Sequence, residues 1–190
     1  MKKLFMILSI MATVACSWHS PDSTFYVMDS EGLRVVSDKN INVTVARVKV
    51  PDMLNKAQMV ISTEDSTQVR VMEFERWGEA YPDVIQSTIT NDLIAYLPNA
   101  YVKRTYFDSG NAQYNVNVEI NKLQAYIGDK VILSAWWNIT DAKGNILQKA
   151  QGSYEAKVEG NDIQDLVNAQ ALAVHQMSEE IALSLAMAKK

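Results

Sequence analysis

The sequence has little of the chemistry that enzymes and metal sites need. Its 190 residues include one cysteine, Cys16, and two histidines, His19 and His175. No cluster of histidine, cysteine and acidic residues has the spacing of metal ligands, and no nucleophile elbow, phosphate loop or dinucleotide fingerprint occurs. We therefore predict no catalytic residue, no metal and no cofactor, and a protein that is not an enzyme; a hydrolase without a recognisable motif is the alternative. His175 should lie at the surface or at the boundary of the core.

The chain also lacks an excess of basic residues and is poor in proline. It has 18 Lys and Arg against 22 Asp and Glu, a formal net charge of −4. This argues against nucleic acid or anionic lipid headgroups as a bulk electrostatic partner. A hydrophobic content of 48% with only four prolines argues against disorder. The length suits one domain with its own core.

The first residues have the features of a secretory signal peptide. Two lysines precede a short apolar run, residues 4–11, that is too short to span a bilayer. Small residues follow, and residues 13–16 read Thr-Val-Ala-Cys. This segment resembles the site at which bacterial lipoprotein signals are cut before a cysteine that carries the lipid. Such sites prefer leucine at the first position, where this chain has Thr13.

Cys16 is predicted to be that acylated residue. A secreted protein that forms disulfides usually has an even number of cysteines, and Cys16 has no partner. The alternative is an ordinary cleaved signal followed by an incidental cysteine. By resemblance to enterobacterial lipoproteins, an aspartate at the next position would hold the protein in the inner membrane, so Ser17 suggests the outer membrane.

These assignments divide the chain into residues 1–15 as a lipoprotein signal peptide, residues 16–23 as a lipidated cysteine with a short tether, and residues 24–190 as one domain. Seven extended residues after the cysteine reach at most about 25 Å. The domain should therefore sit close to the membrane that holds its lipid. Loss of Lys2 and Lys3 with the signal changes the formal net charge from −4 to −6.

An amphipathic helix is predicted over residues 84–97. Pro82 suits the first helical turn and Pro98 ends the helix. Its apolar stripe recurs every four residues: Ile85, Ile89, Leu93 and Leu97. Trp77 precedes the helix and follows a strand, so we predict that it is a buried structural anchor.

The remaining pattern is mostly strand, with a second helix at the end. Strands are expected at residues 24–28, 41–50, 58–62 and 68–74, and a four-strand meander at residues 101–107, 113–126, 131–139 and 148–158. A long helix is expected over residues 162–187, with Asn161 as its cap and Gln164 completing a capping box. The predicted fold class is α+β: an antiparallel sheet with a meander and two helices packed on one face.

Trp136 and Trp137 are adjacent in the third strand of this meander, so they must face opposite ways. One belongs to the core. The other is a candidate partner-binding residue, because large exposed aromatic side chains are enriched at interfaces. The alternative is that a loop or Tyr126 covers it.

Several segments together resemble a known family. They are Cys16, Phe-Tyr-Val at 25–27, Val-Lys-Val-Pro at 48–51, a segment from Leu54 to Val60 that contains Gln58, Arg-Trp-Gly-Glu at 76–79, and Leu-Pro at 97–98. In this combination the chain resembles the auxiliary lipoproteins of ABC-type transport systems, in particular the small outer-membrane lipoprotein of the paraquat-inducible system. Residues 80–82 depart from that pattern, which would have Pro-Leu there.

The resemblance implies a non-enzymatic component of an MCE-type system, which moves lipids or other hydrophobic molecules between the inner and outer membranes and supports membrane integrity. The expected location is the periplasmic face of the outer membrane, held by a palmitate-containing anchor on Cys16. The expected partner is a periplasm-spanning MCE protein, with a homo-oligomer also open and no nucleic acid. The alternative is another periplasmic interaction lipoprotein, such as a cell-wall synthase activator.

Overall fold

The computed structural model describes residues 21–30, 34–65, 67–105 and 112–188, so Cys16 and the predicted signal peptide lie outside the described residues. This part of the chain contains eight strands and two α-helices. In chain order they are β1 (Thr24–Tyr26), β2 (Asn42–Ala46), the short 3₁₀ helix η2 (Asp52–Leu54), β3 (Gln58–Ser62), β4 (Val69–Trp77), α2 (Tyr81–Tyr96), β5 (Tyr101–Thr105), β6 (Tyr114–Ala125), β7 (Lys130–Asp141), β8 (Ile146–Lys157) and α3 (Ile163–Met187).

The described strands form two sheets, with the orders β5-β2-β6-β7-β8 and β1-β4-β3. The predicted α+β class is confirmed, but both sheets are mixed rather than wholly antiparallel. The antiparallel meander has three strands, β6, β7 and β8. The predicted fourth member, β5, instead pairs in parallel with β2, with Val43 opposite Val102. The strand expected over residues 41–50 ends at Ala46, beyond which Lys49 forms only an isolated bridge to Glu119.

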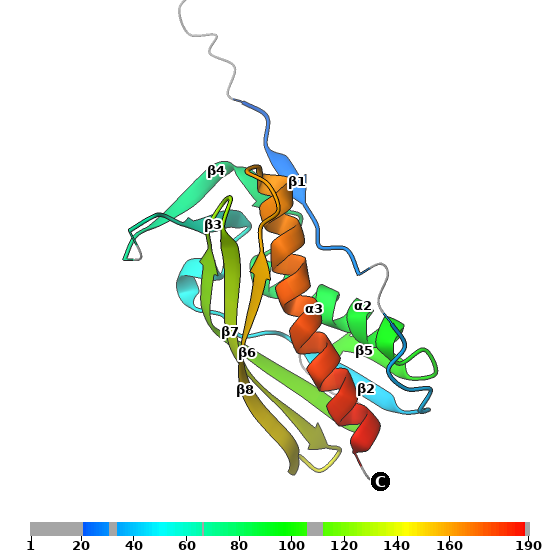
Figure 1. Ribbon diagram of the computed structural model, residues 1–190. Helices are drawn as coiled ribbons and strands as arrows, with labels where there is room; N and C mark the ends of the chain where they lie inside the picture. Colours follow the sequence, from blue (N-terminus) through cyan, green and yellow to red (C-terminus); the bar gives the residue numbers. More distant parts are fainter. Residues whose placement is uncertain (1–20, 31–33, 66, 106–111, 189–190) are drawn as a thin grey trace, which may run out of the picture.

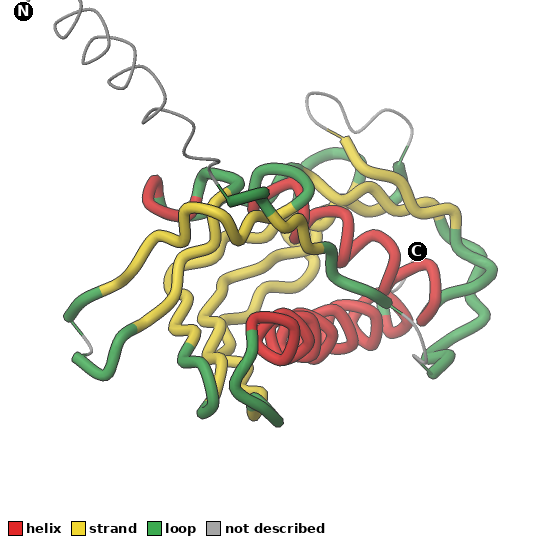
Figure 2. The backbone as a smooth tube through the Cα atoms, turned by 90° about the horizontal axis from the view of Figure 1, so that it is seen from above, coloured by secondary structure: helices red, strands yellow, loops and turns green. Residues whose placement is uncertain are grey.

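Both helices cover the same face of the five-stranded sheet, as predicted. Figure 1 shows α3 crossing β6, β7 and β8, with α2 beside it, and in Figure 2 both helices lie on one side of the strands. The predicted stripe of α2 is fully buried: Ile85, Ile89, Leu93 and Leu97. α2 packs against α3, β2 and β5, and α3 packs against β7, whose buried positions are Val131, Leu133, Ala135, Trp137 and Ile139. One hydrophobic core therefore lies between the helices and this face.

The helix ends follow from local chemistry. α2 has Pro82 in its first turn, where no N–H is needed, and the backbone N–H of Leu97 bonds to Leu93 at its end. The predicted cap of α3 was wrong by one residue. Asp162 is the cap: its side chain accepts from the Asp165 N–H at 2.8 Å, and the Asp165 carboxylate accepts from the Asp162 N–H at 3.3 Å. The extended backbone of Asp162 allows this reciprocal pairing.

Candidate functional site

The neighbouring tryptophans of β7 point to opposite faces of the sheet. Trp137 is 2% exposed and faces the helices, whereas Trp136 is 52% exposed and lies on the face that the helices leave open. Strand alternation makes this division unavoidable. Only Trp136 of the predicted pair is therefore available to a partner, and Trp137 is a core residue.

Trp137 is held in the core by polar as well as apolar contacts. Its indole N–H donates to the Tyr154 hydroxyl at 3.1 Å, and that hydroxyl donates to the Glu180 carboxylate at 2.6 Å. Burial raises the pKa of Tyr154 well above its ordinary value, and the bond to Glu180 adds to this. The hydroxyl thus stays protonated and satisfies a buried indole donor.

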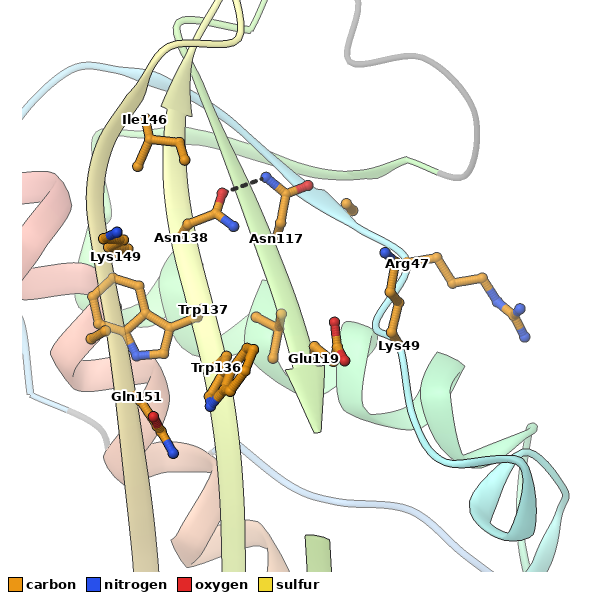
Figure 3. A pocket seen from close by; sticks show the side chains of 13 residues that line it. Arg47, Lys49, Asn117, Glu119, Trp136, Trp137, Asn138, Ile146, Lys149 and Gln151 are labelled. Atoms are coloured by element: carbon orange, nitrogen blue, oxygen red, sulfur yellow. Dashed lines mark hydrogen bonds between the residues drawn. The ribbon is translucent and has the colours of Figure 1, made fainter. Parts of the chain in front are cut away.

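Trp136 stands in a groove of about 740 Å³ on the open face of the sheet. Cross-strand pairing places Glu119 of β6 on one side of it and Gln151 of β8 on the other. Figure 3 shows Glu119 of β6, Trp136 of β7 and Gln151 of β8 at the groove, with Lys49 from the segment after β2, while the side chain of Arg47 points away. Other lining residues are Ala46, Arg47, Lys49, Asn117, Asn138, Ile146 and Lys149.

A second row of polar residues lies beside the tryptophan. Asn117, Asn138 and Lys149 are paired across three adjacent strands. The Asn117 side-chain amide donates to the Asn138 oxygen at 3.0 Å (Figure 3). This bond orients the two side-chain amides relative to each other on the open face of the sheet.

The groove is positively charged although the protein is acidic. Lys49, Lys149 and Arg47 line it, with Glu119 as the one acidic side chain among the lining residues. Arg47 bonds to Asp83 through its Nε at 3.0 Å. Neither lysine forms an ion pair within the described residues. A partner segment with carboxylates would therefore complement this surface.

Sequence reasoning missed these basic residues. Lys149 shares the outward phase of Gln151 in β8, and Lys49 follows the irregular end of β2. The alternation of buried and exposed residues in β8 could have placed Lys149 on the open face of the sheet. Lys49 needed the tertiary fold, because it lies beyond the end of β2 and meets β6 through an isolated bridge to Glu119.

Trp77 lies at the junction of β4 and α2, away from the groove. It is 2% exposed, and its ring centroid is 5.5 Å from that of Tyr81 at an angle of 42°. Its backbone N–H donates to the carbonyl of Ala57 at 2.7 Å. Tyr81 in turn donates to the Gln170 side chain of α3 at 3.2 Å. Trp77 therefore packs where a strand and both helices meet.

His175, predicted at the surface or at the boundary of the core, is only 9% exposed. Its Nδ1 lies 2.9 Å from the fully buried Asp92, so α3 and α2 share a polar contact inside their interface. The sequence did not predict this pair, which needs the helices docked. Within the described residues, no group of three or more His, Cys, Asp or Glu side chains is placed to hold a metal ion.

The fold defines a small α+β domain in which two helices cover one face of a mixed sheet and the other face carries an exposed aromatic groove. A sequence model of the ABC-type transport auxiliary lipoprotein component matches residues 27–182. The chain belongs to this family of membrane-anchored lipoproteins. No helix of the described residues is long and apolar enough to cross a membrane.

Solved structures agree on the fold. The chain is similar to the crystal structure of an uncharacterized protein, with a TM-score of 0.72, 22% identity, and coverage of 87% of this chain and 99% of the other. It is also similar to protein XCC0632 from Xanthomonas campestris, with a TM-score of 0.68, 10% identity, and coverage of 84% and 92%. No curated protein matches the chain significantly.

Proposed function

We propose that this protein is the outer-membrane-anchored, periplasmic lipoprotein of an MCE-type system, which moves lipids or other hydrophobic molecules between membranes and supports membrane integrity. It acts by docking a periplasm-spanning MCE protein and does no chemistry itself. Membership of the transport auxiliary lipoprotein family supports the transport role. Cys16 carries the anchor, and the short tether keeps the domain at the membrane, so the partner must come to it.

The observation that carries the docking proposal is the exposed Trp136 in its groove. A large aromatic side chain on a sheet face offers rigid apolar area at low conformational cost. The polar and charged residues that line the groove around Trp136 resemble the polar rim that surrounds the apolar centre of protein interfaces. Interface tryptophans that act as hot spots contribute about 2 kcal/mol or more to binding.

The test compares the two tryptophans, because one strand supplies a matched pair. Trp136→Ala should leave the thermal unfolding midpoint nearly unchanged and sharply reduce co-purification with the MCE protein from solubilised membranes. Trp137→Ala should lower the midpoint strongly, because it opens a cavity in the core and removes the indole N–H that donates to Tyr154. Leu183→Ala is the control for loss of exposed apolar area, since Leu183 is 47% exposed on α3.

Two results would contradict the proposal. Unchanged capture by the Trp136→Ala protein would move the docking surface elsewhere. Turnover of a lipid or peptidoglycan substrate by the purified protein would show that it is an enzyme.

A further inference from the structure

Two large apolar side chains, Phe25 in β1 and Val27 directly after it, lie in solvent. β1 pairs in parallel with β4, with Tyr26 opposite Trp77. Tyr26 packs against the core, and burial together with a hydrogen bond to Glu75 raises its pKa to about 12. Its neighbours Phe25 and Val27 therefore point the other way. They are 63% and 72% exposed.

α3 extends this apolar surface. Phe25 and Val27 line a shallow hollow of about 570 Å³ together with Ala171 and Leu172 of α3. Leu172 is itself 51% exposed. Figure 1 shows β1 beside the first half of α3. Phe25, Val27 and Leu172 thus form one surface from two elements, which we name the β1 patch.

The position of the β1 patch in the chain limits what can cover it. Phe25 is nine residues after Cys16. Even a fully extended chain of that length spans only about 30 Å. A protein anchored through Cys16 therefore keeps these side chains within one bilayer thickness of the membrane surface.

The charges around the β1 patch favour a neutral lipid surface. Asp29 lines the hollow, and no lysine or arginine does. Asp22 precedes β1 and is exposed. An anionic headgroup would be repelled here, whereas a zwitterionic bilayer accepts apolar side chains without needing a countercharge.

We infer that the β1 patch rests on the bilayer that holds the lipid anchor, with Phe25 and Val27 at the boundary between headgroups and acyl chains. Three side chains bind a bilayer weakly when the protein is free in solution. Tethering through Cys16 makes the contact intramolecular, and the high effective concentration lets a weak contact persist. This inference rests on the anchor at Cys16 and is independent of the MCE partner.

The test uses photochemical cross-linking in vesicles. The mature chain, residues 16–190, is coupled through its only cysteine to a maleimide phospholipid in phosphatidylcholine vesicles. One variant carries Phe25→benzoylphenylalanine. The control carries Ile146→benzoylphenylalanine, because Ile146 is 60% exposed and begins β8, an edge strand of the five-stranded sheet, whereas β1 belongs to the three-stranded sheet. Both positions are exposed, so both variants should fold, and thermal unfolding checks this.

After irradiation, mass spectrometry should find severalfold more phospholipid adduct at position 25 than at position 146. Adding Val27→Ser should reduce the adduct at position 25. A protein–protein adduct at position 25 would show that a second copy covers the patch and would overturn the inference. Equal lipid adducts at both positions, or none at either, would also overturn it.

Discussion

At the scale of single residues, the adjacent Trp136 and Trp137 have different surroundings, because successive side chains of a strand point to opposite faces of the sheet. Trp137 shares the phase of Val131, Leu133 and Ile139, all of which are buried. Trp136 shares the phase of Ser134 and Asn138, which lie on the open face. The apolar alternation of β7 was visible in the sequence and could have separated the two tryptophans. The sequence could not show that nothing among the described residues covers Trp136.

Trp77 supplies the first prediction. Trp77→Ala should lower the free energy of unfolding by about 3–5 kcal/mol, as truncation of a fully buried aromatic residue does. The cost arises because the cavity would open between β4 and α2, next to Tyr81. Urea unfolding followed by circular dichroism measures it. Phe25→Ala is the control, because that aromatic is exposed and should cost little. An unchanged midpoint for Trp77→Ala would show that the junction does not depend on this ring.

At the scale of elements, the interface between α2 and α3 contains polar groups that the apolar stripes did not predict. Asp92 is completely buried next to Leu93 of the stripe. Its partner His175 is 83 residues away in the chain. The helix period can place Asp92 on the boundary of the stripe, but only the docked helices bring the two groups together. Tyr96 adds a third contact, since its hydroxyl donates to the His175 carbonyl at 3.2 Å.

His175→Ala should destabilise the protein by about 3–5 kcal/mol, because it leaves Asp92 buried without its partner. Thermal and urea unfolding measure the loss. Replacing both residues, as Asp92→Leu with His175→Leu, should recover much of it, since an apolar pair leaves no unpaired buried group. If the double variant is as unstable as the sum of the single variants, the two side chains are not energetically coupled.

The same interface predicts sensitivity to alkaline pH. Burial, with a further contribution from the charge of Asp92, raises the pKa of Tyr96 to about 12. The folded pKa lies above the ordinary value of about 10. The stabilising contribution of neutral Tyr96 is therefore complete below pH 10 and is lost as the pH rises through about 12. The unfolding midpoint should fall over this range, and Tyr96→Phe should make the fall shallower. Parallel pH profiles for the two proteins would contradict this.

The topology shows which pairings a sequence can predict. The β6-β7-β8 meander was predicted because its turns are short and carry strong signals, and Gly128 and Gly144 adopt φ of +74° and +85° there. The strand β5 was predicted, but its place in the meander was wrong, because it pairs with β2, which lies more than 50 residues earlier in the chain. Parallel pairing between distant strands leaves no local signal in either of them.

At the scale of the whole molecule, the groove around Trp136 and the β1 patch differ in charge and polarity. The open sheet face carries Trp136 with two lysines, and the β1 patch is apolar with aspartates beside it. The helices cover the remaining face of the large sheet. A domain held by its N-terminal end could thus present the groove to a protein partner while the β1 patch faces lipid.

The last prediction concerns where the whole protein is held, and it uses two adjacent positions. Cys16→Ser should abolish incorporation of labelled palmitate and leave the protein soluble or uncleaved, because no other cysteine can accept the lipid. Ser17→Asp should keep the palmitate but shift the protein from the outer-membrane to the inner-membrane fraction, by analogy with enterobacterial lipoproteins. The Ser17→Asp protein controls for expression and acylation, so the pair separates loss of the anchor from a change of membrane. Palmitate incorporation that survives Cys16→Ser would refute the assigned anchor. Unchanged fractionation of an acylated Ser17→Asp protein would show that residue 17 does not set the membrane in this chain.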